Sequence, residues 1–116
     1  MEQNGIFNGV STVYHVRGNG HDVILLHGWG QNKEMMLPIE EHLAAHFRVW
    51  NFDFPGFGKS ENPPIAWDVS DYVAFLESFI EGNTIKEPIL IGHSFGCRVA
   101  IRYAARHHDV AKMCLT

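Results

Sequence analysis

A serine with a glycine two positions away on either side stands in the stretch IGHSFG, residues 91–96. Ser94 follows an apolar run and precedes a helical pattern, which is how a nucleophilic serine is commonly presented at a sharp strand-to-helix turn. Gly92 and Gly96 leave the space that such a strained turn needs. These residues predict nucleophilic chemistry at the Ser94 hydroxyl, directed at an acyl carbon.

Attack on an acyl carbon generates an oxyanion, which hydrogen-bond donors must stabilise. The helix expected after Ser94 would direct its free N–H groups and its positive dipole end toward that oxyanion, so the N–H of Phe95 is one candidate donor. The N–H of Trp29 is the second candidate, in the motif HGWG at 27–30. This motif ends the first core strand, and ligands gather at the carboxyl ends of parallel strands.

Other polar residues near these motifs have structural as well as chemical interpretations. We expect His27 and Gly28 to hold the loop of Trp29, and His93 to pack beside the elbow, while a direct catalytic role stays open for either histidine. Asp53 ends another core strand and could act as an acid, but capping of the Gly- and Pro-rich loop after it is the favoured interpretation.

The amino-acid composition limits the classes of molecule that the chain is expected to bind. The 116 residues are 46% hydrophobic and 19% charged, with a net charge of −4, which is typical of an ordinary soluble globular domain. Basic residues neither dominate nor cluster, so small molecules or protein partners are expected rather than nucleic acid or a membrane. No cofactor is predicted, and no histidine or cysteine spacing suits a metal site. Cys97 and Cys114 favour a reducing cytoplasm, and no apolar run approaches a membrane span.

Hydrophobic periodicity outlines the scaffold that must position these residues. Apolar or alternating runs predict strands at Thr12–Val16, Val23–Leu26, Arg48–Phe52 and Pro88–Ile91, with a hairpin partner around Ile6–Phe7 and a last strand over Val110–Leu115. Helical spacing predicts helices at 36–46 and at 95–107. A further helix is predicted between them, beginning at a cap at Asp68 or Ser70 and ending at Gly82-Asn83. Alternating strands and helices predict one α/β domain, with a mostly parallel sheet and helices on both faces.

Taken together, the motifs resemble the α/β-hydrolase superfamily, through LLHGWG at 25–30, FDFPGFGKSENP at 52–63 and IGHSFGCRVAI at 91–101. Serine at the nucleophile position makes the chain similar to the esterase, amidase and carbon–carbon hydrolase branches. The resemblance covers essentially all 116 residues. It implies a truncated hydrolase fold of about six strands and three main helices, with the cap and the C-terminal strands absent.

In this superfamily the triad follows the chain order Ser, Asp or Glu, His, so the resemblance implies that the acid and the histidine are absent from this chain. His107 and His108 lie about 20 Å along the helix from Ser94, too far to reach it within one chain. The leading hypothesis is a serine hydrolase scaffold for carboxylic esters or related acyl groups, with weak or partner-dependent activity. The alternative is a non-catalytic truncated or engineered fragment that self-assembles as a folding or binding module.

Three surface features are also expected from the sequence. The last strand would be an unpaired edge, so we expect a homodimer or a higher homo-oligomer. Arg98, Arg102 and Arg106 repeat every four residues, which indicates either a solvated helix face or a surface for acidic groups of the missing half or of a second subunit. Four aromatic residues are predicted to form an apolar mouth near the serine: Trp29, Phe54, Phe57 and Phe95.

Overall fold

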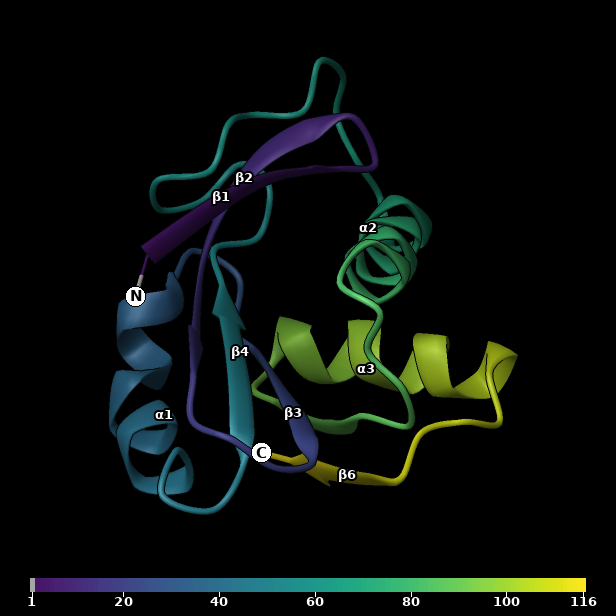
Figure 1. Ribbon diagram of the computed structural model, residues 1–116. Coiled ribbons are helices and arrows are strands. Elements are labelled where there is room, and N and C mark those ends of the chain that lie inside the picture. The colour runs from purple at the N-terminus through teal and green to yellow at the C-terminus, as the bar shows by residue number, and fades with distance from the viewer. Residues whose placement is uncertain (1) are drawn as a thin grey trace.

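The computed structural model describes residues 2–116, in which a six-stranded sheet carries helices on both faces (Figure 1). The strands are β1 (Glu2–Phe7), β2 (Val10–Arg17), β3 (Asp22–Leu26), β4 (Arg48–Phe52), β5 (Ile89–Gly92) and β6 (Lys112–Leu115). Their order in the sheet is β1-β2-β4-β3-β5-β6. The β1–β2 and β2–β4 pairs are antiparallel and the remaining pairs are parallel, so the predicted mostly parallel α/β sheet is confirmed.

The helices divide between the two faces of the sheet. Helix α1 (Leu37–Leu43) lies on one face, and α2 (Val69–Gly82) and α3 (Phe95–Arg106) lie on the other (Figure 1). Asp68 caps α2 and forms a reciprocal capping box with Asp71, so Asp68 rather than Ser70 is the cap. The ends of α2 and α3 agree with the predicted ends to within one residue.

The predicted helix over 36–46 was wrong in its bounds. A short 3₁₀ helix, η1 (Lys33–Met36), comes first, because the side-chain oxygen of Asn32 accepts a hydrogen bond from the N–H of Glu34 at 3.0 Å and caps a tight turn. Helix α1 then ends at Leu43, and residues 44–46 form a turn.

The central strand β3 contributes to two hydrophobic clusters, because successive side chains of a strand point to opposite faces. Val23 and Leu25 face the cluster beside α1. Ile24 and Leu26 belong to the larger cluster that α2 and α3 cover. All four side chains are buried, which explains why the run Val23–Leu26 is apolar at every position rather than at alternate ones.

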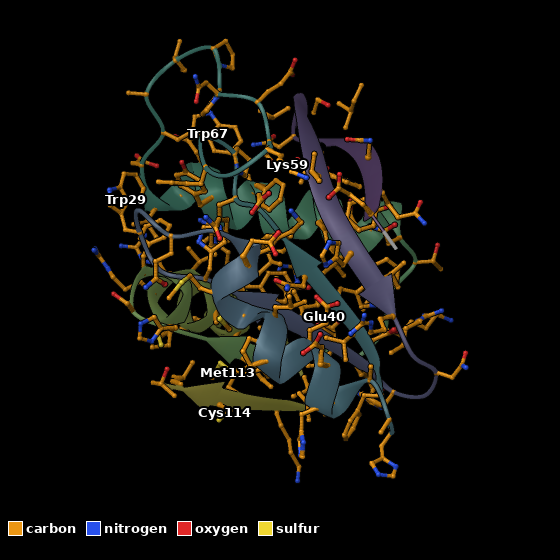
Figure 2. The ribbon with its side chains drawn as sticks, turned by 90° about the vertical axis from the view of Figure 1, so that its left-hand side faces the viewer. Trp29, Glu40, Lys59, Trp67, Met113 and Cys114 are labelled. Carbon is orange, nitrogen blue, oxygen red and sulfur yellow. The ribbon has the colours of Figure 1, made fainter. Side chains whose placement is uncertain are left out.

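Strand β6 forms one edge of the sheet over the described residues. It pairs with β5 and begins at Lys112, two residues later than predicted. Figure 2 shows Met113 and Cys114 on this strand, and all four of its residues are exposed. Within residues 2–116, no helix has the length and apolar character needed to cross a membrane.

Candidate active site

Ser94 lies at a strained turn between β5 and α3. Its φ of 53° and ψ of −113° are unusual for a residue with a side chain. Ser94 is the N-cap of α3, and it is exposed. A Cβ on Gly92 would lie 2.8 Å from the carbonyl oxygen of Gly96, and a Cβ on Gly96 would overlap the carbonyl group of Leu26. The turn therefore needs glycine at both positions.

The loop after β3 packs against this turn. The N–H of His93 donates to the carbonyl of Leu26 at 3.0 Å, which continues the pairing of β5 with β3. The rings of Trp29 and Phe95 meet edge to face, with their centroids 4.9 Å apart. Among residues 2–116, neither the N–H of Trp29 nor that of Phe95 has a hydrogen-bond acceptor. Both predicted oxyanion donors are thus unpaired where the two segments meet.

His27 ties the loop after β3 to the loop after β4. Its ring is fully buried, with Nδ1 donating to the carbonyl of Gly28 at 2.8 Å and Nε2 accepting from the N–H of Phe54 at 3.0 Å. Both bonds fit a neutral ring, and burial lowers the pKa of His27. The described contacts therefore give this histidine a loop-holding position.

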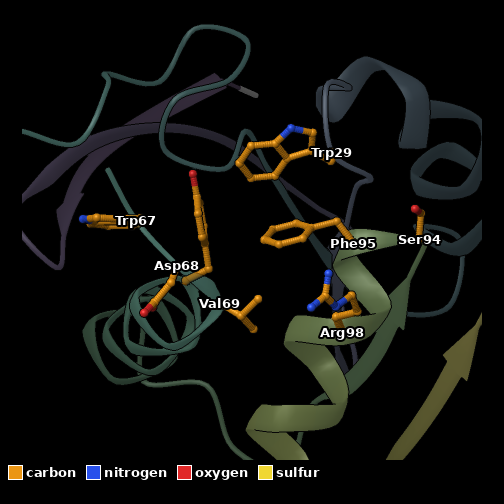
Figure 3. A pocket seen from close by; sticks show the side chains of 8 residues that line it. Trp29, Trp67, Asp68, Val69, Ser94, Phe95 and Arg98 are labelled. Carbon is orange, nitrogen blue, oxygen red and sulfur yellow. The ribbon is translucent and has the colours of Figure 1, made fainter. Parts of the chain in front are cut away.

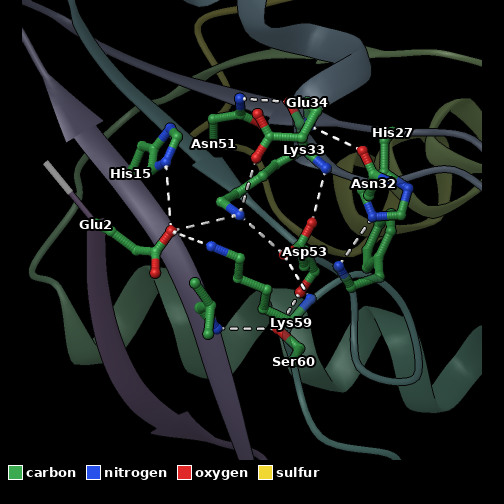
Figure 4. A network of polar contacts seen from close by, with 12 residues as sticks. Glu2, His15, His27, Asn32, Lys33, Glu34, Asn51, Asp53, Lys59 and Ser60 are labelled. Carbon is green, nitrogen blue, oxygen red and sulfur yellow. Dashed lines mark hydrogen bonds and ion pairs between the residues drawn. The ribbon is translucent and has the colours of Figure 1, made fainter.

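The loops after β3 and β4 also meet at the buried carboxylate of Asp53. Its Oδ1 accepts from the N–H of Lys33 at 2.7 Å, and its Oδ2 accepts from the Lys33 ammonium at 3.1 Å and from the N–H of Lys59 at 3.0 Å (Figure 4). Burial alone would lower the pKa of Lys33, but the hydrogen bonds and charges of Asp53 and Glu34 together outweigh it, so the pKa is raised. The contacts give Asp53 the loop-capping position that the sequence favoured.

A second buried carboxylate extends this polar network toward α1. Glu40 accepts from the side-chain amide of Asn51 at 2.8 Å and lies 3.0 Å from Nδ1 of His15. The burial of Glu40 was not predicted, because charged residues in a predicted helical segment are ordinarily exposed. A local signal exists only for Lys33, which follows the N-cap residue Asn32.

A pocket of about 570 Å³ opens beside Ser94, between the N-terminal ends of α2 and α3 (Figure 3). Its wall is largely aromatic: the Tyr72 ring lies 5.2 Å from that of Phe95 and 5.1 Å from that of Trp67. The lining residues are Trp29, Trp67, Asp68, Val69, Tyr72, Ser94, Phe95 and Arg98. Apolar walls with a few polar groups are typical of small-molecule sites.

The predicted aromatic mouth needs one correction. Trp29 and Phe95 line the pocket beside Ser94, and Phe57 lines an adjoining one together with Trp67 and Tyr72. Phe54 is instead fully buried in the core. The sequence did not indicate Trp67 or Tyr72, because Trp67 lies just before α2 and Tyr72 lies in its first turn, and the position of α2 against α3 depends on tertiary packing.

No general base for Ser94 is evident among residues 2–116, where no His, Asp or Glu side chain bonds to its hydroxyl. His93 bonds the hydroxyl of Thr116 at 3.0 Å, and His107 bonds Glu77 at 2.8 Å. Over the same residues, no group of three or more His, Cys, Asp or Glu side chains could hold a metal ion.

Comparison with known families adds to this geometry. Residues 23–115 match the model of the family described as the alpha/beta hydrolase family. The chain belongs to this family. Among curated alpha/beta hydrolase relatives, the pimeloyl-[acyl-carrier protein] methyl ester esterase of Shewanella sp. (strain MR-7) is 40% identical over 87 residues, which cover 75% of this chain and 32% of the relative. The chain thus spans about a third of that relative's length.

Solved structures give the same assignment to the alpha/beta hydrolase fold. The epoxide hydrolase CorEH superposes with a TM-score of 0.92 at 26% identity, over 99% of this chain and 41% of that chain. A bacterial membrane phospholipase A superposes with a TM-score of 0.94 at 28% identity, over 99% of this chain and 38% of that chain. The observed strands and helices therefore form part of the fold that these larger hydrolases share.

Proposed function

We propose that this chain provides the nucleophile and oxyanion donors for hydrolysis of carboxylic esters or related acyl compounds. The observation that carries the proposal is the strained, exposed position of Ser94 beside two unpaired N–H groups, those of Phe95 and Trp29. The Shewanella relative, which is named as a methyl ester esterase, supports an ester as the substrate.

The reaction would begin with attack of the Ser94 oxygen on the ester carbonyl carbon. The carbonyl oxygen then takes negative charge, which the N–H groups of Phe95 and Trp29 stabilise. Loss of the alcohol leaves an acyl-serine, which water hydrolyses to the acid. Because a base must take the serine proton and none bonds to Ser94 among residues 2–116, we assign weak or partner-dependent activity to this chain. An oxyanion hole and binding alone can give roughly 10³-fold acceleration over water.

A fluorophosphonate probe and an activated aryl ester test the proposal. Wild type should be labelled and should turn over the ester, and Ser94→Ala should lose both properties. Ser70→Ala is the matched control, because Ser70 is exposed but does not line the pocket. Labelling that survives in Ser94→Ala contradicts the assigned nucleophile. Folded wild type that neither labels nor turns over the ester favours the non-catalytic binding module.

The proposal also covers the organisation of the molecule. We assign residues 1–116 to one domain that supplies part of a hydrolase core, because both hydrophobic clusters share one sheet. The exposed side chains of Met113 and Leu115 on an edge strand support self-association through β6. A monomer in sedimentation at micromolar concentration would contradict that part. The free thiols of Cys97 and Cys114 support a reducing cytoplasm as the location.

A further inference from the structure

The pocket beside Ser94 contains one arginine. Arg98 lies four residues after Ser94 on α3, which is about 6 Å along the helix axis, and Figure 3 shows it beside Phe95 on the side that faces Val69. The side chain is exposed, and no Asp or Glu among residues 2–116 forms an ion pair with it. The guanidinium is therefore free to bind a ligand in the pocket.

The neighbouring charged side chains either have a partner within the protein or lie outside the pocket. Asp68 also lines the pocket, but its carboxylate accepts the N–H of Asp71 at 3.1 Å as the cap of α2. Arg106 lies 4.0 Å from Glu77. Arg102 is exposed but does not line the pocket. The repeat of three arginines is thus not a uniform solvated face, because only Arg98 lines the site of the candidate nucleophile.

The positive dipole end of α3 gives this part of the pocket a further preference for negative charge, because it lies within one turn of Arg98. A guanidinium can hold a carboxylate through two parallel hydrogen bonds. The rings of Trp29 and Tyr72 offer an apolar wall for the hydrocarbon part of the same ligand.

We propose that Arg98 selects esters that carry a carboxylate group. The apolar part of the substrate lies against the aromatic wall, its ester carbonyl lies at Ser94, and its carboxylate pairs with Arg98. This assignment of a substrate class rests on the proposed function. Arg98 acts as a binding residue that recognises substrate charge and takes no part in bond cleavage.

Equilibrium binding tests the proposal without turnover, because Trp29 and Trp67 line the pocket and their fluorescence should report its occupancy. The probes are 4-phenylbutyrate, its neutral amide 4-phenylbutyramide, and 4-phenylbutylamine. Wild type should bind the carboxylate best, and Arg98→Gln should weaken carboxylate binding about fivefold without changing amide binding, as expected for an exposed ion pair. Added salt should reduce the preference in wild type.

Arg102→Gln is the matched control, since it removes the same charge one helical turn away, outside the pocket. It should leave the affinity for both probes unchanged, and circular dichroism should show that both variants fold. Four results would overturn the proposal: equal affinity for acid and amide in wild type, tightest binding of the amine, equal weakening in the two variants, or no carboxylate binding at millimolar concentration.

Failure of the proposed function would look different from failure of the carboxylate assignment. An unreactive Ser94 would remove labelling and turnover but leave the Arg98-dependent preference for the carboxylate in binding. If Ser94 is reactive but the acid and amide probes bind equally well, the proposed hydrolase function stands and the carboxylate assignment fails. Where turnover is measurable, Arg98→Gln should also lower kcat/KM about fivefold for an aryl monoester of a dicarboxylic acid, relative to its neutral methyl ester.

Discussion

Two groups of polar residues lie after the parallel strands β3, β4 and β5, and their hydrogen-bonding capacity is used in opposite ways. At the elbow, Ser94 is exposed, and the N–H groups of Phe95 and Trp29 have no acceptor among residues 2–116. At Asp53, three donors converge on one buried carboxylate, and the ammonium of Lys33 is buried with it. The elbow retains hydrogen-bond donors for a ligand, whereas the donors around Asp53 are already bonded to its carboxylate.

The difference shows that residue type alone does not separate reactive from structural positions. Asp53 and Lys33 are the kinds of residues that perform acid–base chemistry, yet they bind each other, and their remaining contacts are with the backbone of the adjoining loops and with the carboxylates of Glu2 and Glu34. Ser94 is an ordinary hydroxyl whose backbone and surroundings are unusual. Unsatisfied polar groups at an exposed strand end are therefore the better indicator of a site.

Removing the buried carboxylate should have the largest effect. Asp53→Ala leaves the Lys33 ammonium buried with its main counter-charge gone, which should lower the free energy of unfolding by about 3–5 kcal/mol. A small domain has only about 5–15 kcal/mol in total, so the urea midpoint should fall sharply or the chain should fail to fold. Urea denaturation followed by circular dichroism measures this.

Glu34→Ala is the control for Asp53→Ala. It removes another carboxylate from the same ammonium, at 3.4 Å, but the Glu34 side chain is 56% exposed. The expected loss is below about 1 kcal/mol. Comparable losses in the two variants would show that burial does not distinguish the two ion pairs.

The neutral His27 predicts a smaller effect that depends on pH. Burial lowers its pKa below the ordinary value, which is about 6.5 in the unfolded chain. The folded state then binds fewer protons, so this contribution to stability is complete above about pH 6.5 and is lost as the pH falls toward the folded pKa. The slope for one such group is at most about 1.4 kcal/mol per pH unit. Urea denaturation at several pH values below about 7 measures it.

His27→Gln separates this histidine from the other titrating groups. Its amide oxygen can replace Nε2 as the acceptor for the N–H of Phe54, and it does not titrate. Stability of the variant should fall less steeply below about pH 6.5 than that of wild type. An unchanged slope would assign the pH dependence to other residues.

Much of the fold could be predicted because it depends on local patterns. The apolar run Val23–Leu26 indicated a strand, and Asp68 or Ser70 indicated the start of a helix. The glycines at 92 and 96 indicated a sharp turn, and both approach backbone atoms too closely for a side chain. Each of these features can be predicted from residues that are close together in the sequence.

The unpredicted features depend on contacts between segments that are far apart in sequence. Lys33 is buried because Asp53, which is 20 positions away, accepts its hydrogen bonds. Phe54 was predicted at the pocket mouth, but the position of α2 encloses it in the core. The pocket wall from Trp67 and Tyr72 likewise exists only after α2 packs against α3. Sequence periodicity carries no information on such pairings.

The smallest expected effect tests whether the elbow stores backbone strain. Ser94→Gly removes the side chain from a residue with a φ of 53°. Because the relief of strain should exceed the entropic cost of glycine, the free energy of unfolding should rise by up to about 1 kcal/mol. Ser94→Ala keeps the Cβ, so its stability should match that of wild type, while both variants should lose fluorophosphonate labelling. A glycine variant less stable than the alanine variant, measured by urea denaturation, would show that the turn is not strained. The expected result would mean that the elbow, unlike the Asp53 network, lowers stability in order to hold Ser94 in an exposed position.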